Sequence, residues 1–65
     1  KTGDAFDQAF LEEMIVHHQG AVEMAQLVLA TSTRPELVTL ANNIITAQTS
    51  EIALMKGWLS TWFTN

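Results

Sequence analysis

The chain has 65 residues, of which 48% are hydrophobic, a net charge of −4 at pH 7 and no cysteine. The hydrophobic fraction excludes an intrinsically disordered segment, and the negative charge argues against nucleic-acid binding, which needs a basic surface. Without cysteine, disulfides and thiolate metal sites are excluded, so a domain this small is expected to need a metal, a partner chain or both for stability.

The first predicted element is a helix over about residues 4–30, with apolar residues at helical spacing. Asp4 is expected to cap its N-terminus, and Asp7 lies in its first turn. Gly20 costs roughly 1 kcal/mol inside a helix, so we expect it to mark a close approach of another helix.

The second predicted element is a helix over about residues 35–63. Thr33 and Glu36 have the spacing of a capping box, and Pro35 suits a first helical turn. Nothing in the chain predicts a strand, and no apolar run approaches the roughly 18 residues that a membrane span needs. We therefore expect a single all-α domain over residues 1–65, folded as an antiparallel two-helix hairpin.

Each predicted helix carries a wide apolar stripe. The first stripe consists of Phe6, Phe10, Leu11, Met14, Ala21, Met24, Ala25, Val28 and Leu29, and the second of Leu37, Leu40, Ala41, Ile44, Ile45, Ile52, Met55, Leu59 and Trp62. Two helices cannot cover stripes this wide, so we expect a homodimer of hairpins that forms a four-helix bundle. The aromatic residues are expected to cluster at the open end of the hairpin.

Several polar residues share the apolar stripes. His17 and His18 follow Met14 at i+3 and i+4, and Met24 lies two turns after His17. On the second helix, Gln48, Glu51 and Met55 form one line, and Asp7 precedes Met14 by one heptad. If the turn centres between Ser32 and Thr33, the two histidines face Gln48, and Met14 faces Glu51. Because consecutive residues point about 100° apart, we expect one histidine to contact the hairpin partner and the other to contact the second protomer.

Buried polar groups are costly unless they are paired. Two compensations are possible here: a hydrogen-bond network among the His, Glu and Gln side chains, or a bound cation with imidazole ligands. Imidazole and thioether without thiolate form a soft ligand set that suits Cu(I), and by the same argument Ag(I), but not Ca²⁺ or Mg²⁺. The candidate metal ligands are His17, His18, Met14, Met24, Glu51 and Met55, with Gln48 and Asp7 in supporting positions.

Catalysis is not expected. The chain offers no Ser/His/Asp set and no Gly-rich phosphate loop. The positions three before the histidines are Met14 and Ile15, whereas a di-iron carboxylate oxidase needs Glu there. A redox activity at a bundle metal is thus the least favoured reading, and the main alternative to metal binding is a structural dimerisation domain with a buried polar layer.

The order of these residues resembles a known family. The matching strings are Phe6-Asp7-x-x-Phe10-Leu11-x-x-Met14-Ile15-x-His17-His18-Gln19-x-Ala21-x-x-Met24-Ala25, then Pro35-Glu36-Leu37, Leu40-Ala41, Ile44-Ile45-x-Ala47-Gln48, Glu51-Ile52, Met55 and Trp58-Leu59. Together they resemble the signature of domain of unknown function 305 over nearly the whole chain. Val16 departs from that signature, since the family often has Pro there.

The resemblance implies a ferritin-like helical bundle and an exported bacterial protein. Some members, the CopM-type proteins, are associated with binding copper and silver outside the cytoplasm. Many members carry two such hairpins, so this chain is expected to be either one half of a longer protein or a hairpin that dimerises. The sequence starts at Lys1 rather than Met, so we expect a processed or trimmed piece. With the export that the resemblance implies, the expected location is extracytoplasmic, with a signal segment absent from this chain.

Overall fold

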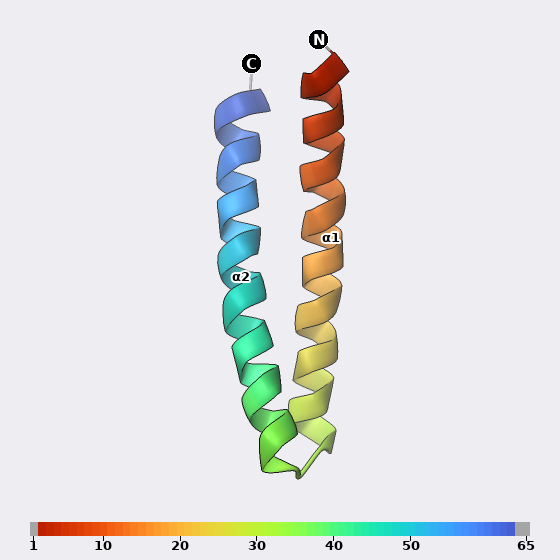
Figure 1. Cartoon of the computed structure of the whole chain (residues 1–65), viewed down its shortest axis with the longest axis vertical. Coiled ribbons are helices and arrows are strands. Elements are labelled where there is room, and N and C mark those ends of the chain that lie inside the picture. Colours follow the sequence, from red (N-terminus) through yellow and green to blue (C-terminus); the bar gives the residue numbers. More distant parts are fainter. Residues whose placement is uncertain (1, 64–65) are drawn as a thin grey trace.

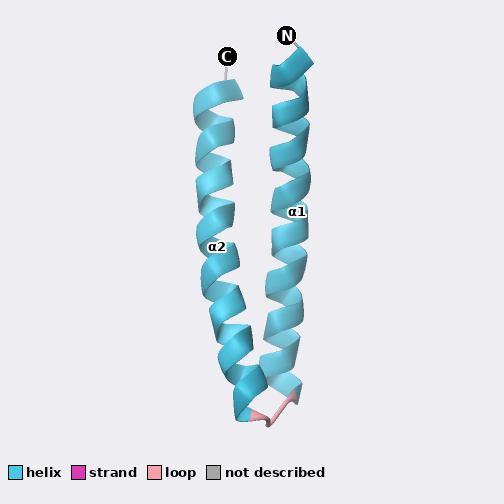
Figure 2. Cartoon of the chain, in the orientation of Figure 1, coloured by secondary structure: helices cyan, strands magenta, loops and turns pink. Residues whose placement is uncertain are grey.

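The computed structural model describes residues 2–63, which form two helices joined by a short turn (Figures 1 and 2). Helix α1 spans Thr2–Thr31 and α2 spans Pro35–Phe63. The helices run antiparallel and side by side, so the start of α1 and the end of α2 lie at the same end of the molecule (Figure 1). The predicted all-α hairpin is therefore confirmed.

Helix α1 begins earlier than the sequence indicated. It includes Thr2, so Asp4 lies within its first turn and is not the N-cap residue. A carboxylate in the first turn still stabilises the helix, because it interacts favourably with the unpaired backbone N–H groups there.

The turn is held by hydrogen bonds between residues that are close in sequence. The backbone N–H of Ser32 donates to the carbonyl of Val28 at 2.8 Å, and the N–H of Arg34 donates to the hydroxyl of Ser32 at 3.2 Å. Helix α2 begins at Pro35 as predicted, but the carbonyl of Arg34 accepts its first helical hydrogen bonds. Arg34 thus takes the N-cap position that the capping-box spacing assigned to Thr33, because a proline at the first helical position makes the preceding residue the cap.

The core of the hairpin is small. Leu11, Ile15 and Met55 form the buried cluster, and smaller buried residues, Ala25 and Ala41, lie nearer the turn. Within residues 2–63, no large side chain is completely buried. One hairpin therefore buries too little apolar surface to be stable by a wide margin.

The elongated shape leaves excess surface. The Cα extents are 49 × 15 × 14 Å, and the radius of gyration is 14.9 Å, against about 11 Å for a compact chain of this length. The solvent-accessible surface is 4865 Å², whereas a compact monomer of 7.2 kDa exposes about 4100 Å². The excess is roughly 700 Å², close to the roughly 800 Å² that each partner buries in a standard protein–protein interface.

Much of the exposed apolar surface lies on one side of the hairpin, which we call the open face. On α1 it is formed by Phe6, Phe10, Met14, His17, Ala21, Met24 and Val28, and on α2 by Leu37, Leu40, Ile44, Glu51, Leu54, Trp58 and Trp62. The members recur at three, four or seven residues, which keeps them on one side of each helix. A groove on the other side is more polar and is lined by Gln19, Val22, Glu23, Thr49 and Ile52.

The segments that the structure describes contain no helix with enough consecutive apolar residues to cross a bilayer.

Glycine within α2 gives the first testable prediction. A Cβ added at Gly57 would meet no atom within 4 Å, and Gly57 lies outside the open face. Gly57→Ala is expected to raise the free energy of unfolding by about 1 kcal/mol, because alanine loses less backbone entropy in a helix. Chemical denaturation would measure this, and an unchanged or lower midpoint would contradict it.

A Cβ added at Gly20 would also meet no atom within 4 Å, so the close approach of another helix expected there is not observed in the hairpin.

Candidate metal-binding site

His18 is the buried polar residue at the centre of the hairpin. It lies seven residues from Leu11 and from Ala25, so all three share the line of α1 that faces α2. Only 9% of His18 is exposed, and its Nε2 lies 2.6 Å from Oε1 of Glu51. Because a carboxylate only accepts, the ring N–H donates this bond. The pair joins α1 to α2 in the middle of the molecule.

Glu51 covers His18 from the solvent side. Its side chain is 56% exposed, and it lies seven residues from both Ile44 and Trp58 on the open face. The carboxylate is therefore wet on one side and bonded to a buried imidazole on the other. It can adjust its position without repacking the core.

The observed side-chain pairing differs from the predicted one. The sequence placed Gln48 opposite the histidines and Glu51 opposite Met14, whereas Glu51 bonds to His18. Helical side chains lean toward the N-terminus of their own helix. In an antiparallel pair, His18 therefore leans away from the turn and Glu51 leans toward it, and they meet between their Cα levels.

Two thioethers share the groove with this pair. The groove is lined by Phe10, Met14, His18, Glu51, Leu54, Met55 and Trp58. Met55 is buried in the core cluster, and Met14 packs against that cluster while partly exposed. Four of the eight residues predicted for the site, namely Met14, His18, Glu51 and Met55, are thus brought together.

The other predicted site residues lie elsewhere. His17 is exposed, so only one of the two imidazoles expected in the interior is buried by the hairpin. Met24 is 64% exposed and borders an apolar hollow near the turn, away from His18. Gln48 is half-buried and Asp7 is exposed. His17 is exposed because consecutive residues of a helix point about 100° apart, so His17 and His18 cannot both face α2.

The groove also has aromatic walls. The aromatic residues lie at the open end of the hairpin, as expected, but their rings pair along each helix: Phe6 with Phe10 at a centroid distance of 6.3 Å, and Trp58 with Trp62 at 5.4 Å. Their i,i+4 spacing was the signal that could have predicted this. Phe10 and Trp58 consequently line the groove beside the His18–Glu51 pair.

The donor set of one hairpin is soft but small. Among the described residues, no group of three or more His, Cys, Asp or Glu side chains is placed to hold a metal ion. One imidazole and one carboxylate are available, and Met14 and Met55 are the further donors in the groove. This combination fits a soft cation, which accepts imidazole and thioether, better than it fits Zn²⁺, Ca²⁺ or Mg²⁺.

Comparison with known proteins defines the family but no function. No curated protein and no solved structure matches the chain. Residues 7–65 match the family described as "Domain of unknown function (DUF305)". This match includes α1 from Asp7 onward, the turn, all of α2 and every residue of the His18 groove. The chain therefore belongs to the DUF305 family.

Proposed function

We propose that the chain is a non-catalytic module that binds a soft metal ion, Cu(I) or Ag(I), for storage, buffering or resistance. The observation that carries the proposal is the buried imidazole of His18, fixed by Glu51 at 2.6 Å in a groove that also contains Met14 and Met55. His18 and the two thioethers would supply soft donors. Glu51 would supply an oxygen donor beside Nε2 and balance the positive charge.

The His18–Glu51 hydrogen bond marks the place for a cation, because Nε2 and the carboxylate oxygen meet at the open groove. With the ring proton on Nδ1, or after an imidazolium has given its Nε2 proton to water, Nε2 offers a lone pair beside that of the carboxylate oxygen, and a positive ion would take the place of the hydrogen bond. The apolar walls of Phe10, Leu54 and Trp58 lower the local dielectric constant and strengthen the attraction.

We also propose that the working form is a homodimer that builds a four-helix bundle outside the cytoplasm. The exposed apolar residues of the open face and the excess surface of roughly 700 Å² support dimerisation. A soft ligand set without cysteine suits an oxidising compartment, where free thiols would form disulfides.

The alternative function is a structural dimerisation domain. One observation favours it: the His18–Glu51 hydrogen bond already satisfies the buried imidazole, and within residues 2–63 no buried side-chain N or O atom lacks a partner. A polar layer of this kind can fix register and pairing without any ligand. It predicts no preference for soft metals.

A competition titration separates the two functions. The chain is titrated with Ag(I), with Cu(I) under reducing conditions and with Zn²⁺, against a chromophoric chelator. Soft-metal binding predicts that Met55→Leu lowers the affinity for Ag(I) by about tenfold or more, because one donor is lost. The substitution nearly conserves volume, so the hairpin should remain folded, which circular dichroism would check.

Ile52→Leu is the matched control, because Ile52 packs against the same core cluster as Met55 but lines the groove on the other side of the hairpin. It should bind Ag(I) as the unmodified chain does. Equal affinities of the unmodified chain and Met55→Leu would remove the thioether site, and an absence of Ag(I) and Cu(I) binding would leave the structural function.

A further inference from the structure

We infer that a second copy of this chain covers the open face in antiparallel orientation, and that this pairing brings the partner's His17 to the His18–Glu51 site. The metal-binding part of this inference rests on the proposed function, whereas the arrangement of the two copies does not. It is argued from the different shapes of the two ends of the open face and from the position of the polar residues between them.

One end of the open face is bulky. Phe6, Phe10, Trp58 and Trp62 lie at the end opposite the turn, and all four are exposed although their rings are among the largest in the chain. The rings stack within each helix, and Trp62 also meets Phe63 edge-on, yet all four residues remain exposed. Exposed aromatic groups of this size favour burial against another protein surface.

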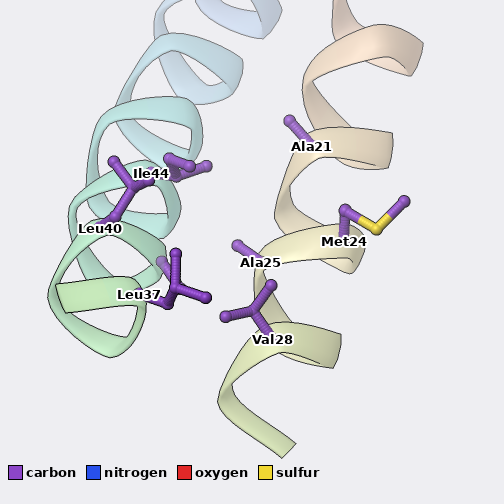
Figure 3. A pocket seen from close by; sticks show the side chains of 8 residues that line it. Ala21, Met24, Ala25, Val28, Leu37, Leu40 and Ile44 are labelled. Carbon is purple, nitrogen blue, oxygen red and sulfur yellow. The ribbon is translucent and has the colours of Figure 1, made fainter. Parts of the chain in front are cut away.

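The other end is hollow. Near the turn, the small side chains Ala21, Ala25 and Ala41 leave an apolar depression between α1 and α2, with Leu37, Leu40 and Ile44 on the far side (Figure 3). The lining contains no polar surface. Such a depression fits an apolar side chain from outside and offers no partner to a polar ligand.

The two ends are equally far from the polar layer. On α1, Phe10 and Met24 each lie seven residues from His17, and on α2, Trp58 and Ile44 each lie seven residues from Glu51. Seven residues are about two turns, or about 10 Å along the axis. A twofold axis across the middle of the hairpin therefore passes at the level of His17 and Glu51.

Rotation about that axis fits bulky groups onto small ones. It sets α1 against the partner's α1, with Phe10 opposite the partner's Met24, and α2 against the partner's α2, with Trp58 opposite the partner's Ile44. The alternative twofold axis, parallel to the helices, would press the aromatic end of one copy against that of the other. It would also leave two hollows facing each other, which costs packing energy.

The size of the face suits a stable dimer. The hairpin exposes roughly 700 Å² more surface than a compact monomer of its mass, near the roughly 800 Å² that each partner buries in a standard interface.

The antiparallel arrangement completes the site. One hairpin supplies a single buried imidazole, and the exposed His17 has no role in it. At the twofold axis, His17 meets the partner's His17, and the His18–Glu51 pair meets the equivalent pair of the second copy. Four imidazoles and two carboxylates then share one layer, in which the two like charges favour a bound cation.

Distance measurement between two spin labels tests the arrangement without metal. Thr33 lies exposed in the turn, and the chain has no cysteine, so Thr33→Cys accepts a single label. Thr33 is 16 residues from His17, so the antiparallel dimer predicts labels about 50 Å apart in pulsed dipolar spectroscopy. The parallel alternative predicts labels within about 20 Å.

A distance near 50 Å supports the inference, and a short distance overturns it. A monomer in sedimentation analysis, with no dipolar coupling, also overturns it.

In the antiparallel dimer, His17→Ala should lower the affinity for Ag(I) by about tenfold, whereas Gln19→Ala, on the opposite side of α1, should not change the affinity. If Ag(I) does not bind but the labels are about 50 Å apart, the proposed function fails and the arrangement stands. If Ag(I) binding is intact at the short distance, only the arrangement fails.

Discussion

Replacing His18 with alanine is expected to lower the affinity for Ag(I) and Cu(I) by a factor of at least about 100. His18 is the only buried imidazole in the described chain, and it joins the two helices through Glu51. Loss of the ring removes the central donor and also the bond that holds the carboxylate in place. Competition titration of the variant beside the unmodified chain would measure the change.

Two further variants make this result interpretable. Glu51→Gln keeps an oxygen that accepts the ring N–H, so folding should be retained while affinity falls by about tenfold with the loss of charge. In His18→Ala, Glu51 loses its hydrogen-bond partner, but because the Glu51 side chain is about half exposed to water, this loss alone should lower the folding stability only slightly. Thermal melts would show whether the variant remains folded. A folded His18→Ala protein with unchanged Ag(I) affinity would exclude the groove as the metal site.

Leu40→Glu is expected to dissociate the proposed dimer and to unfold most of the chain with it. In the single hairpin Leu40 is 53% exposed, so a charge there should change stability by no more than about 0.5 kcal/mol. In the dimer the same charge would be buried without a partner, which costs several kcal/mol. Because one hairpin has only a small core, separated copies should lose helicity.

Leu27→Glu is the matched control. Leu27 is 56% exposed, but it lines neither the apolar hollow nor the His18 groove. The same substitution there should leave sedimentation and thermal stability nearly unchanged. If both variants remain as stable as the unmodified chain, the open face is not an interface between copies. A concentration-dependent melting temperature of the unmodified chain would be independent support for association.

The helices and the turn were predictable because their signals are local. Apolar residues at helical spacing indicated both helices, and Pro35 gave the start of α2 correctly. The start of α1 and the identity of the N-cap residue before α2 were not predicted correctly. These depend on one or two backbone hydrogen bonds at a helix end, where several residue types are compatible with the same position.

The candidate site was predicted in part. Periodicity indicated that His18, Glu51, Met14 and Met55 belong to one region, since each lies on a core-facing or neighbouring line of its helix. The angle between consecutive residues indicated that only one histidine faces the other helix, but it did not indicate which one, because a stripe wide enough to include all apolar residues also includes both. The side of α1 against which α2 packs decides which line of α1 residues faces inward, and the pattern of one helix alone does not give that side.

The sequence by itself determined two amphipathic helices, a turn before Pro35, and a soft donor set of histidine and methionine without cysteine. These follow from side-chain chemistry and the repeat of the helix. Only the tertiary structure decided that Glu51 bonds His18, that His17 and Met24 remain outside, and that the open face is bulky at one end and hollow at the other. Those features arise where side chains from two helices lean past each other, so the register and the relative rotation of the helices set them.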